Sequence, residues 1–141
     1  MGPRGDRIEL KIPQRLEYLG PIRVFFEGIA RDVGFPENDI EKIVMSVDEA
    51  LSNSISYSRD NDEPLWITIE LTLEALSITI VDAGDDYRDR FQKNVELDEH
   101  LREMRQNGLG LHIIKTFMDH VKYNRTSQEK NHLTLVKFLP R

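Results

Sequence analysis

The feature that most constrains this fold is an alternating pattern in the middle of the chain. Residues 65–73 place an apolar side chain at every second position, and residues 76–80 do the same after a short polar break. A period of two is typical of strands that bury one face and expose the other. We therefore predict a β-hairpin that turns at Glu74 and Ala75, in a sheet that helices cover on one face.

Further strands are predicted near the two ends of the chain. Residues 7–12 alternate apolar and charged side chains, and Pro13 ends this pattern because proline has no backbone N–H to donate. Residues 133–139 form an apolar run after a polar turn at residues 125–131. Together with the hairpin, these segments predict a sheet of four strands or more.

Three amphipathic helices are predicted among these strands. The first begins near Pro21 and stops at Gly34, a residue type suited to a helix end. The second opens with a capping box formed by Asn38 and Glu41, and its apolar stripe runs to residue 55. The third carries a stripe that starts at residue 111 and is expected to continue to Val121.

The order of these elements predicts an α+β two-layer sandwich, with helices on one face of a mixed, mostly antiparallel sheet. A chain of 141 residues has the size of one domain, so we assign residues 1–141 to a single domain. The periodicity fails between residues 85 and 107, where charged side chains are crowded. We expect a long loop or a loosely helical lid there.

The composition narrows the possible functions. The 25 acidic and 19 basic residues give a net charge of -6, so no direct nucleic-acid partner is expected. No apolar run approaches the ~20 residues of a membrane span, so no membrane partner is expected either. The chain has no cysteine and no signal peptide, which favours the cytoplasm. A nucleotide remains compatible with this charge, because Mg²⁺ and backbone N–H groups can neutralise its phosphates.

One face of the second predicted helix carries a carboxylate and an amide. Glu49 and Asn53 are four residues apart, so they share a helix face beside the apolar stripe. The amide oxygen suits a hard cation such as Mg²⁺, and the carboxylate could accept a proton from an attacking hydroxyl. An isolated pair of this kind is also what the solvated side of an amphipathic helix contains.

A second candidate site follows an apolar strand. Asp82 comes directly after residues 77–81, where a side chain can project from a rigid strand end. An ionised carboxylate only accepts hydrogen bonds, which matches the amino group of adenine and mismatches the carbonyl of guanine. Gly84 would let the backbone approach a base closely. An ordinary Asp-containing turn is the alternative.

A third candidate site opens the last predicted helix. Gly108, Leu109, Gly110 and Leu111 place free backbone N–H groups at the helix start, where a phosphate chain can bind. Upstream, Arg105 could reach the phosphates, together with Arg102. A flexible turn before a helix would contain the same glycines, and these arginines could also be solvated charges. The four histidines have no zinc-site spacing, and no serine lies in a hydrolase triad pattern.

Taken together, the three segments resemble a known superfamily. VDEALSNSISYS, ITIVDAGDDY and NGLGLHIIKTFMDHVKY are similar to the N, G1 and G2 boxes of the gyrase, histidine-kinase and MutL-type ATPases, over about residues 7–139. The short chain and a final helix expected to end at residues 118–121 look most like the bacterial anti-sigma-factor serine/threonine kinases. The chain departs from the superfamily at Asp85 and Asp86, where another glycine and an apolar residue are common, and at Tyr57, where histidine is common.

The resemblance implies a Bergerat-type ATP-binding fold that uses ATP and Mg²⁺. By motif, Glu49 would be the catalytic base and Asn53 the magnesium ligand. ATP would also be bound by Asp82, Gly84 and the glycine loop, namely Gly108, Leu109, Gly110 and Leu111. Arg105 is assigned to ATP from its position just upstream of that loop.

The resemblance also implies a partner-switching regulator. Such a protein phosphorylates a serine of a small antagonist protein, sequesters a sigma factor and forms a homodimer. An ATP-binding module that sequesters its partner without phosphotransfer is the alternative from another class, although the presence of Glu49 argues against it. The catalytic domain of a two-component histidine kinase ranks third, because its helical domain with the phosphoacceptor histidine finds no room in 141 residues.

Overall fold

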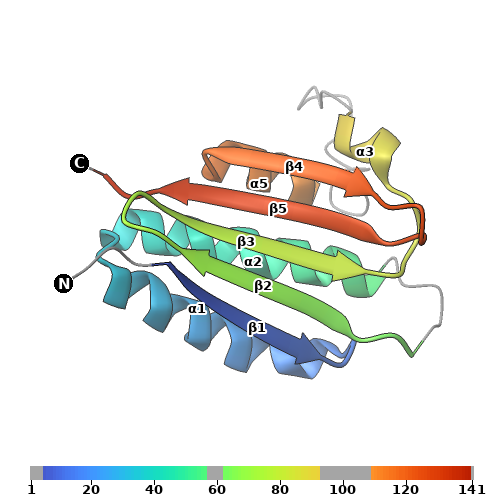
Figure 1. Cartoon of the computed structure of the whole chain (residues 1–141), viewed down its shortest axis with the longest axis horizontal. Helices are drawn as coiled ribbons and strands as arrows, with labels where there is room; N and C mark the ends of the chain where they lie inside the picture. The colour runs from blue at the N-terminus through green and yellow to red at the C-terminus, as the bar shows by residue number, and fades with distance from the viewer. Residues whose placement is uncertain (1–4, 57–61, 93–108, 141) are drawn as a thin grey trace.

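The computed structural model describes residues 5–56, 62–92 and 109–140 (Figure 1). Its strands form one five-stranded sheet in the order β1-β2-β3-β5-β4, and each of these neighbouring pairs is antiparallel. The strands are β1 (Asp6–Ile12), β2 (Leu65–Leu71), β3 (Ala75–Asp82), β4 (His120–Arg125) and β5 (Asn131–Phe138). The described helices are η1 (Leu16–Tyr18), α1 (Leu19–Val33), α2 (Glu37–Ser56), α3 (Arg88–Gln92) and α5 (Leu109–Phe117).

The long helices cover one face of the sheet, which confirms the predicted α+β sandwich. α2 lies between α1 and α5 and packs against both of them, behind the strands in the view of Figure 1. The strands alternate accordingly, since every second residue of β2 is buried and the residues between are more exposed. Within the described ranges, no helix combines the length and the apolar character that crossing a bilayer requires.

The register aligns the ends of β3, β4 and β5 at one end of the sheet. Ile80 on β3, Leu133 on β5 and Tyr123 on β4 form a row that faces the helices. One step further along this face, Asp82 pairs with Asn131, and Asn131 pairs with Arg125. The core is therefore apolar along most of these strands and becomes polar where β3 ends. We call this region, where β3 ends and Asp82, Asn131 and Arg125 lie in register, the polar end of the sheet.

Two helix boundaries show which sequence signals determine where a helix ends or begins. The predicted stop at Gly34 is confirmed, because Gly34 caps α1 with φ 111°, a conformation that glycine adopts without strain. The predicted capping box at Asn38 and Glu41 is wrong. α2 already begins at Glu37, and the Pro36 carbonyl accepts the first helical N–H groups, so Asn38 lies within the first turn.

Two strand boundaries also differ from the prediction. The third long helix ends at Phe117, and Val121 belongs to β4, an edge strand that the helical reading missed. Val121 continues the helical spacing of the stripe, so the sequence alone does not separate the two readings. The hairpin turns one position earlier than predicted, because the Thr72 Oγ1 atom accepts the backbone N–H of Glu74 and of Ala75, and Ala75 starts β3.

Candidate functional site

The polar end of the sheet is organised around a buried carboxylate. Asp82 is only 3% exposed, and its two oxygens accept three hydrogen bonds. Ser54 Oγ donates to Oδ2 at 2.8 Å, the Gly84 N–H donates to Oδ1 at 2.9 Å, and Asn131 Nδ2 donates to Oδ1 at 2.8 Å. Burying a carboxylate is costly unless donors of this kind replace water, so these contacts hold Asp82 as an acceptor.

The contact from Ser54 brings the C-terminal part of α2 to this carboxylate. Asn53 precedes Ser54 in the helix, and Glu49 lies one turn before Asn53, so all three belong to the stretch of α2 that reaches the polar end. Glu49 and Asn53 are both half-buried. Burial raises the pKa of the Glu49 carboxyl, and the neighbouring Asp48 carboxylate raises that pKa further.

The backbone that follows β3 is fixed from both sides. Arg125 Nη1 donates to the Gly84 carbonyl at 2.8 Å, and Asn131 Nδ2 donates to the Asp85 carbonyl at 2.8 Å. Asp86 Oδ1 accepts the Arg88 N–H at 2.9 Å and lies 2.9 Å from the Tyr123 hydroxyl. These bonds lower the pKa of Asp86, with the Arg88 N–H as the largest cause. The aspartates that depart from the superfamily pattern therefore lie in a segment tied to β4 and β5.

Aromatic contacts attach α3 to the polar end of the sheet. The ring centroids of Tyr87 and Tyr123 are 4.4 Å apart, and those of Phe91 and Tyr123 are 5.7 Å apart. The Lys115 ammonium lies 4.2 Å from the Phe91 centroid and donates to the Phe91 carbonyl. Burial raises the pKa of Tyr123, and its hydrogen bond to Asp86 raises it further. The start of the expected lid is thus packed onto β4 and α5.

The predicted phosphate loop is only partly within the described ranges. Arg105 and Gly108 lie outside the described residues, as do Arg102 and Tyr57. Leu109 and Gly110 are the first two residues of α5, which confirms that a helix opens there. The Leu111 side chain is buried in the core, so only its backbone is available to a ligand.

Several polar residues of the site were not predicted from the sequence. Ser54 has no role in the sequence-based prediction, yet it donates to Asp82. Asn131, Arg125 and Tyr123 were given no role. One signal does exist, because Asn131 occupies a position in register with the apolar residues of β5, where an amide needs a specific partner.

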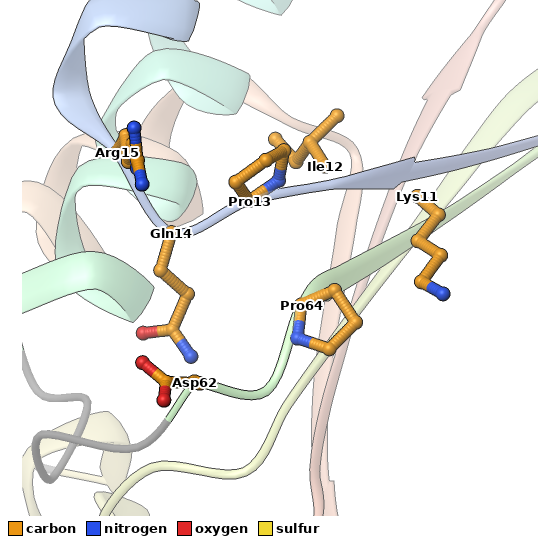
Figure 2. Close-up of a pocket in the computed structure, with 7 residues that line it drawn as sticks. All are labelled: Lys11, Ile12, Pro13, Gln14, Arg15, Asp62 and Pro64. Atoms are coloured by element: carbon orange, nitrogen blue, oxygen red, sulfur yellow. The ribbon is translucent and has the colours of Figure 1, made fainter.

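A separate cavity of about 580 Å³ opens beside the ends of β1 and β2 (Figure 2). It is lined by Lys11, Ile12, Pro13, Gln14, Arg15, Asp62 and Pro64. The Gln14 side chain points toward Asp62, and its Nε2 atom donates to the Glu63 carbonyl. None of the predicted site residues within the described ranges lines this cavity, so we do not assign the nucleotide to it.

Comparison with known proteins places this geometry in a family. The family model described as "Histidine kinase-like ATPase domain" matches residues 12–137. Serine-protein kinase RsbW of Bacillus licheniformis is 33% identical over 144 residues, which cover 96% of this chain and 88% of the relative. Serine-protein kinase RsbW of Bacillus subtilis is 30% identical over 134 residues, covering 90% of this chain and 83% of the relative.

Two solved structures share the fold at low sequence identity. A structure of the RsbU and RsbW domains of a Mycobacterium tuberculosis protein superimposes with a TM-score of 0.70 at 13% identity, covering 96% of this chain and 33% of that chain. The SiaB-SiaC complex from Pseudomonas aeruginosa gives a TM-score of 0.64 at 11% identity, covering 94% of this chain and 89% of that chain. These structures support the fold, and the sequence matches show the family: the chain belongs to the histidine kinase-like ATPase domain family and, within it, to the family of the serine-protein kinase RsbW.

Proposed function

We propose that this chain is an ATP-dependent serine protein kinase and anti-sigma factor, which phosphorylates a small antagonist protein and sequesters a sigma factor. The observation that carries the proposal is the buried Asp82 carboxylate, held as an acceptor next to the stretch of α2 that bears Asn53 and Glu49. Relatives named serine-protein kinase RsbW, which match most of the chain, support the phosphotransfer.

In this proposal Asp82 recognises the adenine base. Its Oδ1 atom already accepts two hydrogen bonds, whereas Oδ2 accepts one, from Ser54, among the described residues. Because each carboxylate oxygen has two acceptor positions, Oδ2 keeps one acceptor position for the amino group of adenine. Guanine would bring a carbonyl to the same atom, and two acceptors repel. The backbone of the buried Gly84 lies against the other oxygen, Oδ1, to which its N–H donates.

The phosphates are assigned to the start of α5. The first backbone N–H groups of a helix have no partner within the helix, so those of Leu109, Gly110 and Leu111 are suited to phosphate oxygens. Gly108 completes this part of the proposal from the motif, and Arg105 from its position just upstream of the glycine loop. The nucleotide would then extend from the polar end of the sheet to the start of α5, the helix that packs against α2.

The site fits Mg²⁺ bound largely through the nucleotide. Among the described residues no group of three His, Cys, Asp or Glu side chains could hold a metal ion. Asn53 offers an amide oxygen on the face that also carries Glu49, and Mg²⁺ commonly takes few protein ligands and keeps phosphate and water oxygens. When bound, the ion neutralises charge on the phosphoryl oxygens.

Glu49 is the proposed base for phosphotransfer. Its half-buried carboxylate would orient the serine hydroxyl of the antagonist and take its proton as the oxygen attacks the γ-phosphate. Burial raises the pKa of Glu49, which makes the carboxylate a better proton acceptor than a solvated glutamate. In this proposal residues 1–141 form a single domain with residues 85–107 as its lid. The protein is a homodimer and acts in the cytoplasm.

The first test replaces the proposed base. Glu49→Gln should leave ATP affinity within about twofold and should lower phosphotransfer to a serine of a candidate antagonist by about 100-fold, as expected for losing a general base. Labelled γ-phosphate transfer and ATP titration measure the two quantities. Glu41→Gln, an exposed change eight residues earlier on α2, is the control. Transfer by Glu49→Gln at the wild-type rate would remove Glu49 from the mechanism, and ATP binding by the wild type without transfer would favour a sequestering module.

A second test addresses the proposed contact between Asp82 and adenine. Asp82→Asn can keep its bonds to Gly84 and Asn131 if its new amide group donates to Ser54 Oγ, so the fold should survive. The group facing adenine then changes from acceptor to donor, and we expect ATP binding to weaken by about 1.5–3 kcal/mol. Calorimetric titration with ATP measures this loss, with the exposed Asp32→Asn change on α1 as control. An unchanged titration would refute the adenine assignment.

A third prediction follows from the raised pKa of Glu49. A carboxyl whose pKa is raised in the folded state contributes stability below its ordinary pKa and loses it as the pH rises through the folded value. The ionised carboxylate therefore destabilises the native state near pH 7. Glu49→Gln should raise the free energy of unfolding there, and the gain should shrink as the pH approaches about 4.3, the ordinary pKa of glutamate. Urea unfolding across this range, with Glu41→Gln alongside, checks the trend, and a gain independent of pH would contradict it.

A further inference from the structure

Asn131 is a buried asparagine whose amide has a polar neighbour at each of its hydrogen-bonding positions. It is 1% exposed and lies between the partner strands β3 and β4 at the polar end of the sheet. Its Nδ2 atom donates to Asp82 Oδ1 and to the Asp85 carbonyl, both at 2.8 Å. Its Oδ1 atom accepts from Arg125 Nη1 at 3.0 Å and also faces the Tyr123 hydroxyl, whose single proton lies within reach of both Asn131 Oδ1 and Asp86 Oδ1. Two donors and two lone pairs are all that an amide offers.

These four partners fix the direction of the amide. Both atoms facing Nδ2 are oxygens that accept, and Oδ1 faces the Arg125 guanidinium, which can only donate, and the Tyr123 hydroxyl. A flipped amide would place an oxygen against the Asp82 carboxylate and an N–H group against the Arg125 guanidinium, so the flipped state is strongly disfavoured. Asn131 is therefore a rigid link between the Asp82 carboxylate and the segment that follows β3.

The link determines which oxygen of Asp82 is left for a ligand. Asn131 and the Gly84 N–H together occupy Oδ1. Among the residues that the structure describes, the acceptor position that remains is therefore on Oδ2, next to Ser54. Arg125 donates both to Asn131 Oδ1 and to the Gly84 carbonyl, so the same bonds hold the backbone beside the carboxylate. Neither an apolar side chain nor a carboxylate at this position can donate to Asp82 and accept from Arg125 at once.

We propose that Asn131 is a positioning and specificity residue for the nucleotide base. It fixes the orientation of the Asp82 carboxylate and of the Gly84 backbone, so that a single acceptor oxygen faces the amino group of adenine. This inference rests on the proposed function, because it assumes that Asp82 contacts adenine. Asn131 itself need not touch the nucleotide, and its effect should appear in nucleotide binding and in the choice of base.

The test uses two variants of the full chain and a matched control. Asn131→Asp keeps the size of the side chain and turns an acceptor toward Asp82, while Asn131→Leu removes the amide without adding charge. Asn124→Asp makes the same chemical change at an exposed position of β4. Circular dichroism with thermal unfolding identifies the folded variants. Phosphotransfer kinetics with ATP, and calorimetric titration with ADP and GDP, then measure KM, kcat and the preference for adenine.

We expect each folded Asn131 variant to raise the KM for ATP about tenfold and to lower the ADP-over-GDP preference, with kcat within about threefold of wild type. Combining Asn131→Leu with Ser54→Ala should give less than the sum of the separate binding losses, because both residues act on Asp82. Asn124→Asp should behave as wild type.

Two results would overturn the inference. One is a KM and an ADP preference in the folded variants that match those of Asn124→Asp. The other is loss of the folded state in both Asn131 variants, which would assign the residue a purely structural role. A wild-type chain that binds neither ATP nor ADP would instead refute the proposed function, so the two failures are distinguishable.

Discussion

The polar end of this molecule depends on keeping one carboxylate out of water. Asp82 is nearly inaccessible, and it is tolerated because α2, β5 and the backbone after β3 each supply a donor. Satisfying these three bonds requires the end of α2 to meet the ends of β3 and β5. This packing places Glu49 and Asn53 at the same end of the sheet. The proposed adenine site and the proposed catalytic face of α2 therefore have one structural origin.

The surrounding contacts extend this arrangement to the segment after β3. Arg125 and Asn131 hold the carbonyls of Gly84 and Asp85, and Tyr123 packs against Tyr87 and Phe91. The described part of that segment is therefore attached to β4, β5 and α5. Glu49, in contrast, lies in an unfavourable environment for an ionised side chain, because burial and the neighbouring Asp48 carboxylate both raise its pKa. The proposed site thus combines a well-connected part, assigned to the adenine, with a carboxylate, assigned to phosphotransfer, whose burial lowers the stability of the native state.

Much of the fold could be predicted from periodicity, because β1, β2, β3, β5, α1 and α2 each bury one regular face. β4 could not, because Val121 continues the helical spacing of α5 as well as it begins an alternating strand. The motif positions Glu49, Asn53, Asp82 and Gly84 could be chosen from the sequence. Ser54 and Asn131 could not be linked to Asp82 in this way, because these contacts join residues 28 and 49 positions apart and depend on the packing of α2 and on the pairing of β3 with β5.

The central claim is that the carboxylate at the polar end of the sheet selects an adenine nucleotide. Calorimetric titration of the wild-type chain with ADP and with GDP, in the presence of Mg²⁺, tests it most directly. The account predicts that ADP binds at least about tenfold more tightly than GDP, because the acceptor-only carboxylate gains a hydrogen bond from adenine and opposes the guanine carbonyl. Equal affinity for the two nucleotides, or tighter binding of GDP, would contradict it.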